Sequence, residues 1–365
     1  MTGLRLLMTL DAVGGVWQHA IDLAAGLRAR GVSVVLAGLG PRPDAAQMAQ
    51  ARTIGPVEWG AAPLDWLAER PADLAAIGPW LDGLAARHQV DVLHLNLPTQ
   101  AVGLACGLPV LTMSHSCLAT WFAAVRGSDV PEDMAWQRDL TAQGLAAADL
   151  IVAPSQAHAD ALARCYGSLP ALAVVPNTSR AALPDRLRLP QIVAVGRWWD
   201  DGKNGGLLDE AAARTDWPVS LVGALSGPNG ARIVLSHAQH AGALSHPDTL
   251  ARIAEAGIFC APSRYEPFGL AVLEAARGAA PLVLADIPTF RELWDGAAIF
   301  FDPADAGELS DVLNRLSRNP AQQKELGRAA CARAARLTPD TQVAAMLRLY
   351  RRLAVAAAPA QTATG

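Results

Sequence analysis

Residues 261 to 274 read APSRYEPFGLAVLE, and they join the end of a predicted strand to the start of a predicted helix. The apolar run at 258–261 predicts a strand that stops at Pro262, and the sequence from about Phe268 onward predicts a helix. The loop between them displays the carboxylate of Glu266. A strand followed directly by a helix is the repeating unit of parallel sheets, so we expect an α/β fold.

The start of this predicted helix suits an anion. The backbone N–H groups of Phe268, Gly269 and Leu270 lack helical partners there, and the helix dipole also attracts negative charge. Gly269 lets a phosphate or a sugar approach the backbone closely. Glu274, about one and a half turns further on, can accept two hydrogen bonds from a cis-diol such as ribose. The alternative is that Glu266 and Glu274 are solvated carboxylates; the motif around them favours binding.

Strand-sized apolar runs and helix-length segments alternate along the rest of the chain. The expected strands lie at 4–10, 32–38, 91–95, 109–113, 150–153 and 172–175, and then at 191–195, 219–222, 258–261, 282–285 and 299–301. The expected helices lie at 16–30, 72–88, 132–148, 156–166, 321–337 and 340–354. This alternation predicts parallel sheets covered by helices, whose ligands bind beyond the carboxyl ends of the strands.

The composition excludes several classes of protein. The 365 residues carry a net charge of −4, unlike the basic surface of a nucleic-acid binder. The five cysteines are odd in number and none stand at C-x-x-C spacing, which argues against a disulfide framework or a zinc site. No run approaches the ~20 apolar residues of a membrane span. We therefore expect a soluble cytoplasmic protein that binds no nucleic acid.

The motif at 262–274 resembles a family signature. Glu266 and Glu274 enclose P-F-G-L and follow P-S-R-Y. This pattern is similar to the E-x7-E signature of retaining glycosyltransferases with the GT-B fold, most closely those of family four, and the resemblance covers most of the chain. It implies two Rossmann-like parallel-sheet domains that face each other across a cleft, with a C-terminal helix that crosses back to the first domain.

The resemblance and the composition together divide the chain. Residues 176–190 are rich in Arg, Pro and Ser and show no clear period, so we interpret them as a linker. We expect an acceptor-side domain at 1–175, a nucleotide-sugar donor domain at 191–337, a crossover helix at 338–356 and a flexible tail at 357–365.

Other segments resemble the family where it binds the donor diphosphate. Gly14 and Gly15 lie between the first strand and the first helix, where the family has a glycine-rich turn. Arg197 after a glycine, and Lys203 before an asparagine, resemble the family's two cationic positions. Arg offers a planar fork of donors and Lys a point charge, and fixed cations stabilise a leaving group that gains negative charge. The chain has no G-x-G-x-x-G motif, so a dinucleotide cofactor is not expected.

The segment after the strand at 109–113 is expected to shape the acceptor side. His115 follows that strand, where the family has a histidine beside the sugar and the acceptor. Trp121 and Phe122 come next and have three interpretations: they stack on acceptor sugars, touch a membrane surface that carries a lipid-linked acceptor, or fill a core.

The resemblance implies a role for each of these residues. Glu274 holds the ribose of the nucleotide, whereas Glu266 and Phe268 orient the hexose. Glu266 and His115 are the expected catalytic residues. No metal and no cofactor beyond the nucleotide-sugar co-substrate is expected, because two cations supply the positive charge. The residues expected to hold the diphosphate are Arg197, Lys203, Gly15, Gly269 and Leu270.

The implied activity is that of a retaining hexosyltransferase. A hexose moves from a UDP or GDP sugar to a glycan, lipid-linked or small-molecule acceptor, in polysaccharide or glycoconjugate synthesis, with peripheral membrane contact as an option. The alternatives are a GT-B phosphorylase or epimerase, and a non-catalytic partner subunit that binds a nucleotide sugar. A pyridoxal-dependent phosphorylase requires a Schiff-base lysine, and the chain offers only Lys203 and Lys324.

Overall fold

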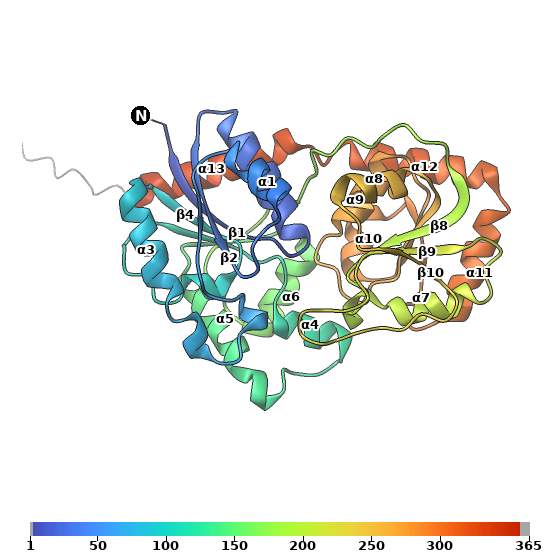
Figure 1. Ribbon diagram of the computed structural model, residues 1–365, viewed down its shortest axis with the longest axis horizontal. Coiled ribbons are helices and arrows are strands. Elements are labelled where there is room, and N and C mark those ends of the chain that lie inside the picture. Colours follow the sequence, from blue (N-terminus) through green and yellow to red (C-terminus); the bar gives the residue numbers. More distant parts are fainter. Residues whose placement is uncertain (1–2, 358–365) are drawn as a thin grey trace, which may run out of the picture.

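The computed structural model describes residues 3–357, which form two α/β units side by side (Figure 1). Within these residues, the first unit has a seven-stranded sheet of order β3-β2-β1-β4-β5-β6-β7, and the second has a six-stranded sheet of order β10-β9-β8-β11-β12-β13. Every named strand pair is parallel. The predicted fold of two Rossmann-like parallel sheets is therefore confirmed.

The first unit contains β1 to β7 and α1 to α6. Its strands are β1 (Arg5–Asp11), β2 (Ser33–Leu39), β3 (Val57–Trp59), β4 (Val92–Leu95), β5 (Val110–Met113), β6 (Leu150–Ala153) and β7 (Leu172–Val174). Its helices are α1 (Gly15–Arg28), α2 (Ala45–Arg52), α3 (Ile77–His88), α4 (Leu118–Val125), α5 (Ala135–Ala147) and α6 (Gln156–Tyr166). Short 3₁₀ turns are η1 (Asp65–Leu67), η2 (Pro71–Leu74), η3 (Pro98–Ala101) and η4 (Glu132–Met134).

The second unit repeats the strand–helix alternation. Its strands are β8 (Leu189–Val195), β9 (Val219–Val222), β10 (Gln239–Gly242), β11 (Ala256–Ala261), β12 (Leu282–Ala285) and β13 (Ala298–Phe301). Its helices are α7 (Gly205–Ala212), α8 (His246–Ala254), α9 (Leu270–Arg277), α10 (Pro288–Trp294), α11 (Ala306–Ser317) and α12 (Pro320–Ala334), and its 3₁₀ turn is η5 (Asp201–Lys203). The chain ends in α13 (Pro339–Ala357). Residues 358–365 of the predicted tail lie outside the described residues.

The central strands are apolar because helices cover both faces of each sheet. On β1, Leu6, Leu7 and Met8 are fully buried, although they point alternately to opposite faces. Leu6 and Met8 belong to one core and Leu7 to another, on the other side of the sheet. A central strand that is covered on both faces therefore requires a continuous apolar run, whereas a strand with one exposed face would alternate apolar and polar residues.

The helix predicted at 72–88 is wrong in its first part. The structure has the 3₁₀ turn η2 followed by α3, which begins at Ile77. Pro79 explains the late start, because proline has no N–H to bond the carbonyl of residue 75 and is tolerated only in the first turn of a helix. Pro79 occupies the third position of α3.

The last helix returns from the second unit to the first, as Figure 1 shows. Val343, Met346 and Tyr350 of α13 are buried in the same core as β1 and α1. The fit is close, because a Cβ on Gly26 of α1 would lie 2.5 Å from Val343 Cγ2. Within residues 3–357 no helix has the length and apolar character needed to cross a bilayer.

The buried hydrogen bond of α13 leads to a stability prediction. The Tyr350 hydroxyl lies 2.6 Å from Nδ1 of His94 on β4, and both side chains are inaccessible to solvent. Tyr350→Phe should lower the free energy of unfolding by about 1–3 kcal/mol, because it leaves a buried ring nitrogen without a partner. Urea unfolding at pH 7.5 measures this, with the exposed Arg352→Ala as control. A Phe variant as stable as wild type would contradict it.

Candidate functional site

The site lies at the junction of the two units, where the turn after β1 meets the loops after β8 and β11. A Cβ on Gly14 would lie 3.2 Å from Nη1 of Arg197, and one on Gly15 would lie 3.3 Å from Cδ1 of Leu270. The structure thus brings together three segments that the sequence separates by up to about 250 residues. We call this contact region the junction.

The start of α9 presents unpaired donors at the junction. Gly269 caps the helix with φ 90° and ψ 69°, a left-handed conformation that favours glycine. The backbone N–H groups of Phe268, Gly269 and Leu270 donate no hydrogen bond to another described residue. The Phe268 ring is buried beneath them. The sequence predicts an anion site at this helix start, and the unpaired N–H groups there have the geometry that such a site requires.

Lys203 and Glu266 pair with each other in this structure. The Lys203 ammonium contacts the Glu266 carboxylate in an ion pair whose side chains are 18 % and 17 % exposed. The loops that carry them are also joined, since the backbone N–H of Arg264 donates to the carbonyl of Gly202 at 2.9 Å. Asn204 anchors the same loop through its side-chain amide, which donates to the carbonyls of Pro262 and Pro303.

Arg197 keeps most of its donors free. Its guanidinium lies 5.6 Å from the Trp199 ring centroid and makes a long contact of 3.4 Å to Asp200. Its Nε is buried and has no hydrogen-bond partner among residues 3–357. Because a buried unpaired guanidinium N–H is unfavourable, Arg197 is placed to gain from an anion beside the Gly14–Gly15 turn.

Glu274 lies buried at 5 % exposure, one and a half turns into α9. Its Oε1 accepts hydrogen bonds from Ser179 Oγ at 3.1 Å and from His246 Nε2 at 2.9 Å. The contact with Glu274 raises the pKa of His246. Oε2 accepts no bond from a described residue, so it is available to a ligand. No sequence pattern marks Ser179 or His246 as hydrogen-bond partners of Glu274.

His115 is held in one orientation by neighbours at the ends of β1 and β4. Its Nε2 lies 2.8 Å from Oδ1 of Asn96, whose Nδ2 donates to the carbonyl of Thr9 at 2.5 Å. The amide orientation therefore places the proton of His115 on Nε2 and leaves a lone pair on Nδ1. Sequence analysis missed Asn96, although a polar residue directly after a buried strand was a usable signal.

Three buried histidines, His19, His94 and His158, and the half-buried His115 lie in the first unit and are neutral at pH 7. Burial lowers the pKa of His19 and of His158 to about 4, and that of His94 to about 3. It also lowers the pKa of His115 well below its usual value, with the neighbouring histidines adding to the effect. His115 can therefore accept a hydrogen bond at Nδ1, but it carries no charge.

Asp11 is a further acid at the junction that sequence analysis did not identify. Burial raises its pKa to about 6, opposed by the Val13 N–H and the Arg197 charge and reinforced by Asp65. Asp11 is the last residue of β1, so its position at a strand's carboxyl end was a signal.

The predicted acceptor-side aromatic residues join the two units. Trp121 Nε1 donates to Oδ1 of Asp200 at 2.9 Å, and Arg126 lies over the Trp121 ring at 4.9 Å. The Phe122 ring packs edge-on against Trp121 at 5.2 Å. Arg126 also pairs with Asp201. Trp121 thus holds the loop that carries Lys203.

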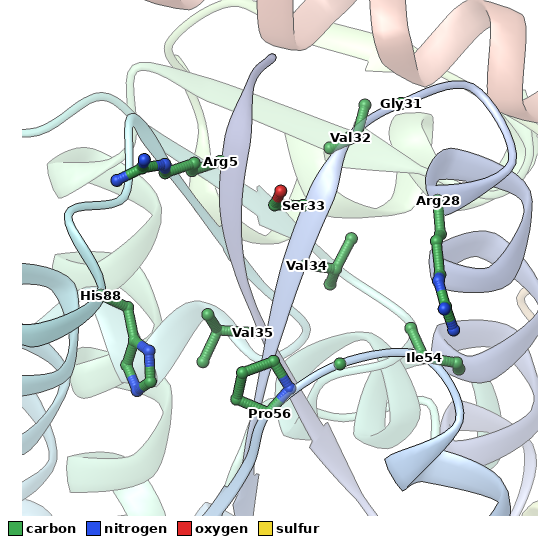
Figure 2. Close-up of a pocket in the computed structure, with 11 residues that line it drawn as sticks. Arg5, Arg28, Gly31, Val32, Ser33, Val34, Val35, Ile54, Pro56 and His88 are labelled. Carbon is green, nitrogen blue, oxygen red and sulfur yellow. The ribbon is translucent and has the colours of Figure 1, made fainter. Parts of the chain in front are cut away.

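A cavity of about 490 Å³ opens elsewhere, at the amino ends of β1 and β2 (Figure 2). Arg5, Arg28 and His88 line it. The Arg5 side chain donates to Gln89, and His88 faces Glu58 at 3.6 Å. Ligands of open parallel sheets bind at the carboxyl ends of the strands, so we assign the site to the junction.

Comparison with known families gives two matches. The family described as Glycosyltransferase Family 4 matches residues 13–178, and the one described as Glycosyl transferases group 1 matches residues 230–333. A D-inositol 3-phosphate glycosyltransferase of Xylanimonas cellulosilytica is 30 % identical over 71 % of either chain. A phosphatidyl-myo-inositol mannosyltransferase of Mycobacterium leprae is 26 % identical over 98 % of either chain.

Solved structures are similar in fold. Sucrose-phosphate synthase from Thermosynechococcus elongatus superposes with a TM-score of 0.76 at 17 % identity, covering 97 % of this chain and 100 % of that one. Anabaena HepE in complex with UDP-glucose superposes with a TM-score of 0.72 at 19 % identity, covering 95 % and 100 %. At these identities the likeness concerns the fold alone.

The buried histidines predict acid sensitivity. Each has a pKa below the unfolded value of about 6.5, so the unfolded chain takes up protons that the folded chain does not. The free energy of unfolding that the neutral histidines contribute is therefore fully present above pH 6.5. It is lost as the pH falls from 6.5 toward 4, where the unfolded chain binds protons more strongly than the folded chain. Urea unfolding between pH 7.5 and 4.5 should show this loss. His158→Gln retains a hydrogen-bond partner for Ser114 and cannot titrate, so the free energy of unfolding of this variant should change less with pH than that of wild type. An equal change in both proteins would contradict the low pKa of His158.

Proposed function

Because the chain belongs to the group 1 glycosyltransferases with the GT-B fold, we propose that it transfers a hexose from a nucleotide-diphosphate sugar to a hydroxyl acceptor with retention of anomeric configuration. One observation carries the proposal: the Gly14–Gly15 turn, Arg197 and the unpaired N–H groups at the start of α9 meet at one place. The second unit thus offers a diphosphate both the Arg197 guanidinium and the N–H groups of α9, and the glycine turn of the first unit lies beside them.

The donor binds mainly to the second unit. Arg197, Lys203 and the amides of Gly269 and Leu270 hold the diphosphate, assisted by Gly15. The free Oε2 of Glu274 accepts a ribose hydroxyl. UDP or GDP is the nucleotide, and the complex of Anabaena HepE with UDP-glucose supports UDP. We propose no metal and no further cofactor, because the two cations balance the leaving charge.

The donor also changes the partner of Glu266. A diphosphate competes for the Lys203 ammonium, which releases Glu266 to accept hydroxyl hydrogen bonds from the hexose beside Phe268. His115, neutral and with a free Nδ1, accepts a bond from the same sugar or from the acceptor. These two side chains are the catalytic residues of the proposal.

The chemical step is a front-side substitution. The bond from the anomeric carbon to the leaving phosphate oxygen breaks, the acceptor oxygen bonds to the same face of that carbon, and the acceptor proton passes to the leaving phosphate. Arg197 and Lys203 stabilise the negative charge that accumulates on the diphosphate. The acceptor is a glycan, a lipid-linked sugar or a small molecule, in polysaccharide or glycoconjugate synthesis in the cytoplasm.

Donor binding tests the proposal. Calorimetry with UDP, GDP and their glucose and mannose derivatives should show one nucleotide bound tightly by wild type. Lys203→Ala and Glu274→Ala should each weaken it by about 10- to 100-fold, because each removes a charge-assisted hydrogen bond. Lys324→Ala removes the other lysine, which is exposed on α12, and should bind normally. Folded wild type that binds none of these nucleotides would refute the donor site.

Turnover separates an enzyme from a binding subunit. Wild type should hydrolyse its donor slowly without acceptor and yield a product with the donor's anomeric configuration by NMR. Glu266→Gln should retain donor binding and lower kcat by about 10²- to 10³-fold, because the hexose loses an orienting carboxylate. Glu325→Gln, an exposed change on α12, is the control. Donor binding without any hydrolysis would favour the non-catalytic subunit.

A further inference from the structure

Asp11 is a buried carboxylate that the proposed donor site does not use. It is 5 % exposed, and its Oδ1 accepts a hydrogen bond from the backbone N–H of Val13 at 2.8 Å. Oδ2 accepts no hydrogen bond from any residue of 3–357. Burial raises the pKa of Asp11 to about 6, so the ionised form destabilises the fold at neutral pH. A buried acid of this kind with an unused oxygen suggests a role in binding.

The position of Asp11 is on the acceptor side. β1 pairs with β4 and β4 with β5, so Asp11, Asn96 and His115 follow three adjacent strands at one edge of the sheet. The hydrogen bonds from Asn96 to Thr9 and from His115 to Asn96 tie these strand ends together. Asp11 therefore lies at the same edge of the sheet as His115, which faces the hexose and the acceptor in the proposed function, with the end of β4 between them.

The charges around Asp11 do not favour a phosphate. Asp65 lies close enough to raise the pKa of Asp11, and His115 is neutral. Arg197 is the cation that acts on Asp11, and the proposed function commits it to the donor diphosphate. The first-unit arginines on this side of the sheet are exposed or paired with acids of their own: Arg42, Arg70, Arg126 and Arg138.

We propose that Asp11 binds hydroxyl groups of an unphosphorylated sugar or polyol acceptor, and that it discriminates against acceptors that carry a phosphate at this position. A carboxylate oxygen is a strong hydrogen-bond acceptor for hydroxyl groups. A phosphate would meet the like charges of Asp11 and Asp65 in a poorly solvated site. The inference rests on the proposed transferase function and specifies its acceptor class.

The test variant is Asp11→Asn. Asparagine retains the size and the oxygen that accepts from Val13, and it removes the charge. Nucleotide release from saturating donor is measured with matched probes: glucose and glucose 6-phosphate, mannose and mannose 6-phosphate, myo-inositol and its phosphate. At least one unphosphorylated probe should accelerate nucleotide release by the wild-type protein. The variant should raise KM for that probe by about 10- to 100-fold and leave the calorimetric donor affinity unchanged.

Asp139→Asn is the matched control. Asp139 lies on α5, where it pairs with Arg138, and its side chain is 57 % exposed. This variant should retain the wild-type KM for the unphosphorylated probe, because it changes only a surface acid. Asp11→Asn should unfold at a temperature no lower than wild type at pH 7.5, because it removes a buried charge, and this separates lost binding from lost folding.

The outcomes distinguish this inference from the function on which it rests. Absence of nucleotide-sugar binding by wild type overturns the proposed function. If donor binding and hydrolysis are present, three results overturn the inference alone: acceleration by no unphosphorylated probe, an unchanged KM in Asp11→Asn, or a donor affinity that falls together with acceptor use. The last result would mean that Asp11 orients Arg197 for donor binding and does not bind the acceptor.

Discussion

The Gly14–Gly15 turn of the first unit lies close to Arg197 and Leu270 of the second unit, and this contact constrains how the two units pack together. Gly14 has φ 84°, and a Cβ there would lie 3.2 Å from the guanidinium, so a side chain would displace the arginine. The turn opens α1, and α1 packs against α13, which returns from the second unit. This backbone segment therefore limits how closely the two units approach each other beside Arg197 and the start of α9.

Charge is divided between the two sides of the junction. The second unit supplies Arg197, Lys203 and the start of α9, which together suit a diphosphate. The first unit supplies neutral histidines and the buried acid Asp11. Because low polarity strengthens both attraction and repulsion, this division agrees with the two proposals, which place an anionic group on the second unit and a hydroxyl-rich group on the first.

The sequence predicted the fold well, because the central strands are continuous apolar runs that no other element resembles. It missed β3 and β10, which are short strands at the sheet edges with exposed or half-buried residues and therefore little apolar pattern. Of the candidate site, it identified the residues in motifs. It missed His246 and Asp11, since a hydrogen bond to Glu274 and the burial of a strand end depend on tertiary packing.

Contacts between the units also determine where Glu266 points. The residue before it, Tyr265, shares a hydrogen bond of 2.7 Å with Thr120 of α4, and the carbonyl of Pro267 after it accepts from Ser155 at 2.7 Å. Both partners belong to the first unit, so separating the units would break the bonds that flank Glu266 on either side. In the proposed function Glu266 orients the hexose, so this acid would be correctly placed only while the two units are in contact.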